Sequence, residues 1–173
     1  MEKLTIEHLA PYLPHELKMI FNRKGGRVIT LTAIGKQAGF GDTISGGYGS
    51  MWLESCGFNP ILRPFSDVTK EITHKGETFV PMHRLKNGGT DRNEFRYIEW
   101  KGYGAIDNEE HETTFDPKTM SFYQFYMGES RICTKQYEKF QKLFEWHFDV
   151  FGLIPAGLAV SVDSITDNPY EKA

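Results

Sequence analysis

Residues 134–151 place the tightest constraint on what this chain can fold into. Large apolar side chains recur there at spacings of three and four, a pattern typical of one face of a helix. Gly152 follows as a helix stop signal. We therefore predict one long amphipathic C-terminal helix over residues 134–151, whose aromatic face packs in the core. That face consists of Tyr137, Phe140, Phe144, His147, Phe148 and Phe151.

Alternating apolar residues ahead of this helix predict strands. Residues 17–21 and 29–33 alternate on either side of residues 22–26, which have the composition of a turn, so we predict a β-hairpin. Residues 95–100 and 120–127 are interpreted as further strands. Strands that precede one dominant helix favour the α+β class, with a mostly antiparallel sheet packed on the long C-terminal helix.

The length and composition predict a single domain. The chain has 173 residues, of which 14% are aromatic, and this is enough apolar surface for one sizeable core. We assign residues 1–165 to one α+β domain. Residues 166–173 are polar, and we predict that they form a frayed tail.

Charge and cysteine content exclude several classes of protein. The net charge is −3, which does not resemble the strong basic excess of a general nucleic-acid binder. The two cysteines, Cys56 and Cys133, are too few for a disulfide framework or a four-thiolate zinc site. No run approaches the ~20 apolar residues that span a bilayer. We therefore expect a soluble cytoplasmic protein with no membrane partner.

Residues 35–49 are rich in glycine and nearly uncharged, and we predict a long loop there. The spacing of Gly41 and Gly46 is that of a Walker A loop, but the lysine that this motif requires next is replaced by Gly47. We predict an exposed binding loop with Phe40 and Tyr48 as anchors and with Gly46 and Gly47 offering close backbone approach. The alternative is that both rings fold into the core. A small-ligand or enzymatic role for this loop is a third functional hypothesis.

The hairpin over residues 18–27 carries a second candidate site. Arg23, Lys24 and Arg27 lie in or near its turn, with the aromatic residues Tyr12 and Phe21 nearby. Cations interleaved with aromatic rings are typical of platforms that bind single-stranded nucleic acid. The alternative interpretation is a turn whose charges only keep the hairpin soluble.

Catalytic and metal-binding signatures are weaker than these binding signals. The six histidines provide no pair at the three- or four-residue spacing of a helical metal site. The carboxylates between Asp107 and Asp116 lack the EF-hand pattern and are interpreted as a solvated loop. We predict no catalytic residues, no metal site and no cofactor.

Three segments taken together resemble a known group of proteins. Residues 4–14, 60–67 and 146–154 are similar, in that order, to small uncharacterised proteins encoded by phages and prophages of gut bacteria. That family has no assigned fold or activity, so the resemblance implies a setting, the cytoplasm of an infected bacterium, and no site residues. We therefore expect a phage-derived accessory protein that binds a host or phage macromolecule. A protein partner is the first hypothesis, and a nucleic acid bound by the basic hairpin is the second.

Overall fold

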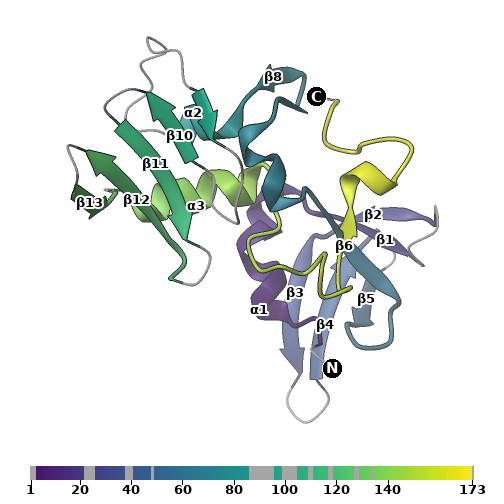
Figure 1. The fold of residues 1–173 in the computed structure, drawn as a ribbon. Coiled ribbons are helices and arrows are strands. Elements are labelled where there is room, and N and C mark those ends of the chain that lie inside the picture. Colours follow the sequence, from purple (N-terminus) through teal and green to yellow (C-terminus); the bar gives the residue numbers. More distant parts are fainter. Residues whose placement is uncertain are drawn as a thin grey trace. The chain divides into compact units, whose positions relative to one another are not determined.

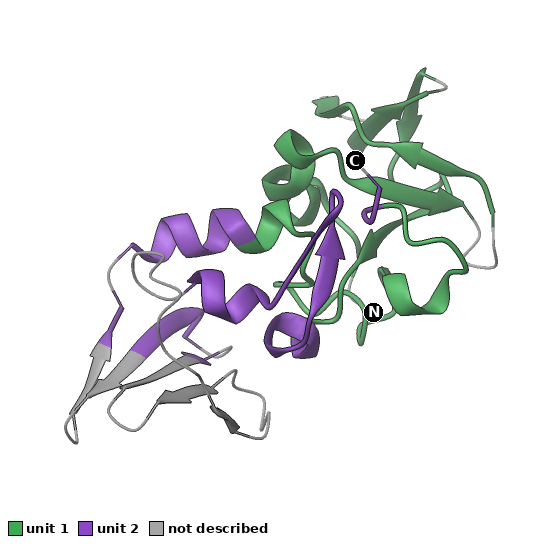
Figure 2. Ribbon diagram, turned by 90° about the horizontal axis from the view of Figure 1, so that it is seen from above, with its two compact units in different colours: residues 1–65, 143–169 green, residues 66–142, 170–173 purple. Residues whose placement is uncertain are grey.

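The computed structural model describes residues 3–21, 26–37, 41–47, 49–85, 96–98, 105–108, 111–116, 119–126, 129–133 and 135–172. The chain divides into two compact units, which Figure 2 distinguishes by colour. Unit 1 comprises residues 1–65 and 143–169. Unit 2 comprises residues 66–142 and 170–173.

Unit 1 contains a four-stranded sheet and a three-stranded sheet (Figure 1). The four-stranded sheet has the order β14-β6-β1-β2, in which β14 and β6 are parallel and the other pairs are antiparallel. The three-stranded sheet has the order β3-β4-β5 and is antiparallel. The strands are β1 (Lys18–Phe21), β2 (Val28–Thr30), β3 (Ala33–Gln37), β4 (Gly41–Gly46), β5 (Gly49–Trp52), β6 (Phe58–Leu62) and β14 (Val160–Ser161).

Two residues carry the chain from one sheet of unit 1 to the other. The Leu31 N–H donates to the Leu17 carbonyl at 2.8 Å, whereas the next N–H, that of Thr32, donates to the Ser45 carbonyl at 2.9 Å. Consecutive amides thus bond to different sheets, and no buried amide is left unsatisfied at the junction. The core of the unit includes Leu9, Leu17, Met19, Ile29, Leu31, Ile44, Ile61, Leu62 and Phe148.

The predicted hairpin is confirmed. β1 pairs with β2 in the register Lys18↔Thr30, Met19↔Ile29 and Ile20↔Val28. Its alternating apolar residues match the period of a strand, and its turn composition lies at the chain reversal, so both local signals agree with the fold.

The predicted loop over residues 35–49 is wrong, because this stretch contains the end of β3, all of β4 and the first residue of β5. Ile44 is fully buried in the middle of β4 and gives the strand an anchor in the core. Gly41 and Gly49 have φ angles of 108° and 92°, which suit glycine where the chain turns into the next strand. Gly41 and Gly49 therefore serve strand starts rather than one long irregular loop.

The predicted C-terminal helix is also wrong in extent. α3 spans Gln136–Glu145, and the chain then turns at His147, whose φ is 61°. The Phe148 N–H donates to the Leu143 carbonyl at 2.9 Å and the His147 N–H donates to the Phe144 carbonyl at 3.0 Å. These two bonds form a Schellman motif, which ends the helix seven residues before Gly152.

Residues 146–150 follow this motif as turns with one isolated bridge. Phe148 forms a parallel bridge with Arg63, and Trp146, Phe148 and Val150 are buried. The same aromatic residues fit a helical period and, at every second position, a strand, so their spacing did not distinguish the two. The fold is therefore a set of several sheets with short helices, and the predicted single sheet on a long C-terminal helix is wrong.

Unit 2 contains a five-stranded antiparallel sheet in the order β13-β12-β11-β10-β9 and the two-stranded pair β7-β8. Its described core joins the sheet to α3, because the ring centroid of Phe140 lies 6.0 Å from that of Phe115 and 5.7 Å from that of Phe122. The strand predicted over residues 120–127 is confirmed as β12. The other elements are β7 (Ile72–His74), β8 (Glu77–Phe79), α2 (Pro81–Leu85), β9 (Arg96–Ile98), β10 (Ala105–Asn108), β11 (His111–Asp116), β12 (Ser121–Tyr126) and β13 (Glu129–Ile132).

The remaining helical segments are short. α1 (Ile6–Leu9) begins after Thr5, and η1 (Ala10–His15), a 3-10 helix, follows it directly. Two further 3-10 turns are η2 (Phe65–Thr69) and η3 (Val162–Ser164). The predicted frayed tail is held in place near its end, because Tyr170 is buried and its carbonyl accepts from the Lys75 N–H at 2.8 Å.

Candidate functional site

Three residues on neighbouring strands form a row at the turn end of the β1–β2 hairpin. Phe21 of β1 pairs in register with Phe58 of β6. On its other side, the Phe21 N–H donates to the carbonyl of Arg27, which precedes β2, at 3.0 Å. Side chains of directly opposite residues share one face of a sheet, so Phe58, Phe21 and Arg27 stand side by side. We call this set the aromatic–arginine row.

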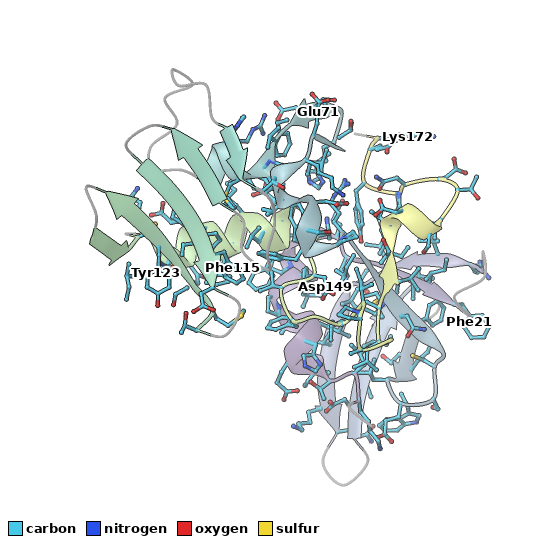
Figure 3. The ribbon with its side chains drawn as sticks, viewed as in Figure 1. Phe21, Glu71, Phe115, Tyr123, Asp149 and Lys172 are labelled. Carbon is cyan, nitrogen blue, oxygen red and sulfur yellow. The ribbon has the colours of Figure 1, made fainter. Side chains whose placement is uncertain are left out.

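The row lies where the buried face of the sheet reaches solvent. Met19, Ile29 and Pro60 form the next row on the same face and are all buried. In the aromatic–arginine row, by contrast, Phe21 is 39% exposed, Arg27 is exposed and Phe58 is half-buried. Figure 3 shows the Phe21 side chain at the outer end of its strand.

The two rings of the row contact each other and leave area open to a ligand. Their centroids lie 5.3 Å apart with planes tilted by 55°, a favourable aromatic arrangement. Exposed aromatic and guanidinium groups side by side are the residue types that dominate the energetics of interfaces.

Gly26 fixes the backbone beside the row. A methyl group at this position would overlap the backbone carbonyl of Phe21. Only glycine allows the two chain segments to approach so closely, and this approach keeps Arg27 opposite Phe21. The row therefore depends on a turn residue as well as on strand pairing.

The residues predicted as binding anchors are only partly described. Gly46 and Gly47 end β4 and begin the next turn, whereas Phe40 and Tyr48 lie outside the described residues. A methyl group on Gly46 would lie 2.7 Å from the Ile29 Cδ1 atom, so this glycine serves internal packing. A methyl group on Gly47 would meet nothing within 4 Å.

The predicted nucleic-acid contacts divide in a similar way. Arg27 belongs to the aromatic–arginine row, whereas Arg23 and Lys24 lie outside the described residues. Phe21 is in the row as well, but Tyr12 is fully buried and is wrong as a platform residue. Phe58 was not predicted. Its place after a turn and at the start of an apolar run was the available signal, but its pairing with Phe21 depends on contacts between distant segments.

A second cluster, which we call the polar junction, consists of Tyr12, Arg63, His147 and Asp149 in the interior of unit 1. The Tyr12 hydroxyl donates to the Phe148 carbonyl at 2.6 Å, and the Arg63 Nε donates to the Trp146 carbonyl at 3.2 Å. The His147 Nε2 lies 2.8 Å from the His15 carbonyl oxygen. All four side chains are buried.

The polar junction brings together three segments that lie far apart in the sequence, residues 4–14, 60–67 and 146–154. Tyr12 comes from the first segment, Arg63 from the second and Asp149 from the third. Backbone bonds join the second and third segments, since the Arg63 N–H donates to the His147 carbonyl at 2.7 Å and the Asp149 N–H donates to the Arg63 carbonyl at 2.8 Å. These three segments therefore meet in the interior of the unit.

Asp149 organises the chain after the junction. Its Oδ1 accepts from the Leu153 N–H at 2.7 Å and its Oδ2 accepts from the Ile154 N–H at 2.8 Å. Burial raises the pKa of this carboxyl above its ordinary value, and the backbone hydrogen bonds from Ile154, Leu153 and Gly152 oppose that rise. The carboxyl is engaged with its own chain, so we assign it a structural role.

Unit 2 buries an ionisable group on α3, Lys139. Its Nζ donates to the carbonyl of Leu85, the last residue of α2, and lies 5.9 Å from the centroid of the Phe122 ring. Burial lowers the pKa of this ammonium and raises that of the nearby Cys133 thiol. An ammonium at a helix C-terminus stabilises the helix, which accounts for this lysine without a ligand.

Among the described residues, no three His, Cys, Asp or Glu side chains are grouped closely enough to hold a metal ion. No described helix is both long and apolar enough to cross a membrane. Comparisons of the chain with protein-family models, curated proteins and solved structures found no match. The aromatic–arginine row is therefore assessed on its own geometry.

Proposed function

We propose that this protein acts by binding another macromolecule and that the aromatic–arginine row is its contact surface. The observation that carries this proposal is the exposure of Phe21 and Arg27 beside Phe58 at the end of an otherwise buried sheet face. A stable fold gains little from leaving such rings in water, whereas aromatic and arginine side chains often anchor interfaces.

The polar junction supports a binding role over a catalytic one. Asp149 and Arg63, groups that often take part in catalysis, are buried and donate to or accept from backbone groups of their own unit. Because their hydrogen bonds go to the backbone, these two side chains hold segments of unit 1 together. The exposed chemistry of the row suits recognition.

The setting of this binding is part of the proposal. The resemblance of residues 4–14, 60–67 and 146–154 to phage-encoded proteins favours an accessory protein in the cytoplasm of an infected bacterium. The partner is then a macromolecule of the host or of the phage.

Affinity capture tests the proposal. Tagged parent protein, a variant with Phe21→Ala and Arg27→Ala, and a control with Tyr137→Ala are incubated with lysate from infected and uninfected bacteria. Tyr137 is a matched control because it is an exposed aromatic residue, at 74%, that belongs to unit 2. We expect the parent and control to retain the same macromolecule and the row variant to lose it. Equal capture by the row variant, or loss in the control alone, would contradict the assignment.

A further inference from the structure

We infer that the macromolecule bound by the aromatic–arginine row is a single-stranded nucleic acid. This inference rests on the proposed function, because it names the partner class of the same surface. Three observations support it: the order of the side chains across the strands, the charge of the hairpin, and the exposure of ring surface at a sheet end.

The order of the side chains suits a chain of bases. Phe58 and Phe21 lie on the neighbouring strands β6 and β1, Arg27 lies directly before the next strand β2, and neighbouring strands are spaced about 4.8 Å apart. Unstacked bases can lie on aromatic rings, and the planar guanidinium can stack on a base or bind a phosphate with two parallel hydrogen bonds. A single strand that crosses the sheet would meet two rings and then a cation.

The charge of this part of the chain is opposite to that of the whole. Residues 17–30, which include the hairpin, contain four cationic side chains and no Asp or Glu, although the net charge of the chain is −3. In the turn that precedes β6, Glu54 forms an ion pair with Lys3 at 2.8 Å. The hairpin therefore offers a local positive charge to a polyanion. The cations of residues 17–30 are Lys18, Arg23, Lys24 and Arg27.

Exposed rings favour a single strand over a duplex or a protein. Base faces are accessible only when the bases are unstacked, and a duplex offers its phosphates but not these faces. An apolar protein surface would use the rings but would gain nothing from a hairpin without carboxylates. Rings and cations together match the features of single-stranded nucleic acid.

Direct binding measurements test this inference. The probes are fluorescent oligonucleotides of about 15 nucleotides, poly-dT and poly-rU, and a mixed-sequence DNA duplex of the same length. Anisotropy titrations begin at about 50 mM salt, where electrostatic binding is strong, and continue to higher salt. We expect saturable binding of the single strands by the parent, binding that weakens as salt rises, and a lower affinity for the duplex.

Variants of the row separate stacking from apolar contact. Phe21→Leu keeps an apolar side chain but removes the ring, so we expect the affinity for poly-dT to fall about tenfold. Phe21→Tyr keeps the ring and should bind about as well as the parent. Tyr137→Leu is the matched control in unit 2, where we expect no change. Circular dichroism establishes that each variant is folded.

A charge variant tests the phosphate contact. Arg27→Glu should weaken binding and reduce the magnitude of the slope of log affinity against log salt by about 0.7, the value for one phosphate contact to a single strand. Lys172→Glu makes the same charge change at an exposed position of unit 2 and should leave both quantities unchanged.

Failure of this inference is distinguishable from failure of the proposed function. If folded parent protein binds neither single-stranded probe at low salt, or if Phe21→Leu binds as tightly as the parent, the inference is overturned. If nuclease-treated lysate still yields a protein captured through Phe21 and Arg27, the row remains a binding surface and only the partner class is wrong. If the row variant loses nothing in either assay, both conclusions fail.

Discussion

The polar junction and the aromatic–arginine row use similar residue types and differ in what surrounds them. Both combine aromatic rings with an arginine in unit 1, yet Tyr12 and Arg63 are buried whereas Phe21 is 39% exposed and Arg27 is exposed. The polar groups of the junction bond to backbone carbonyls and amides, whereas the row leaves Phe21 and Arg27 open to solvent. Burial, more than residue type, thus separates a structural centre from a candidate contact surface.

The largest predicted loss of stability comes from Phe148, which lies between His147 and Asp149 of the polar junction. The Phe148 ring is fully buried, so Phe148→Ala, which keeps the backbone carbonyl but leaves a cavity, should lower the free energy of unfolding by about 3–5 kcal/mol. Phe151→Ala, at a ring that is 39% exposed, should cost less than half as much. Urea denaturation measures both. Coincident transitions for the parent and Phe148→Ala would show that this segment is not core.

A smaller effect is expected at Asp149, where the junction holds the following loop. Asp149→Asn replaces one of two acceptors with a donor, so one of the Leu153 and Ile154 amides loses its partner, at a cost of about 1–3 kcal/mol. Asp149→Glu, which keeps the charge but lengthens the side chain, is the companion variant that separates charge from geometry. A loss of stability in Asp149→Glu but not in Asp149→Asn would assign the residue a packing role alone.

The Asp149 variant also has a predicted pH dependence. Because burial raises the pKa of this carboxyl in the folded state, the folded protein retains its proton to a higher pH than the unfolded chain does. The stability of the parent relative to Asp149→Asn should therefore be greatest at acidic pH and decline as pH rises from the unfolded pKa through the raised folded value. Urea denaturation across a pH series checks the sign, and a relative stability that instead increases over this window would show that hydrogen bonding outweighs burial.

Gly26 tests whether the row depends on the turn. The methyl group of Gly26→Ala would overlap the Phe21 carbonyl, so we expect a loss of about 1–3 kcal/mol and a disturbed pairing of Arg27 with Phe21. Gly47→Ala is the matched control, because a methyl group there meets nothing within 4 Å. Thermal melts of the two variants should differ clearly. An unchanged melt for Gly26→Ala would mean that the turn adopts a looser conformation.

The smallest predicted loss of stability is that of Phe21 in the aromatic–arginine row. Phe21 is partly exposed, so Phe21→Ala should cost about 1–2 kcal/mol, through lost contact with Phe58. Its urea transition should stay close to that of the parent, well above that of Phe148→Ala. A cost as large as that of Phe148→Ala would assign the Phe21 ring to the core and remove it from the candidate surface.

Local patterns in the sequence predicted part of this fold. The β1–β2 hairpin and β12 follow from alternation and turn residues, which act over a few positions. The end of α3 could not be predicted in this way, because His147 adopts a left-handed conformation that is uncommon for residues other than glycine. The glycine-rich residues 35–49 led to the wrong prediction of a loop, because glycine suits hairpin ends as well as loops. Ile44 was the apolar residue that indicated a buried strand there.

The candidate site was predictable only in outline. The cations of the hairpin and the ring of Phe21 are visible in the sequence as a basic, aromatic hairpin. Phe58 belongs to the candidate site because β6 pairs with β1, and Tyr12 does not belong to it because its side chain is buried. Such long-range pairing leaves no periodic signal, so it required the structure.

The central claim is that the aromatic–arginine row, and not the polar junction, contacts the partner. The most direct test is a nuclear magnetic resonance titration of isotope-labelled protein with the poly-dT probe, which maps amide shift changes onto the chain. We expect the largest changes at Phe21, Arg27 and Phe58 and little change at His147 and Asp149. Changes centred on residues 146–154, or on unit 2, with the row unaffected would contradict the claim.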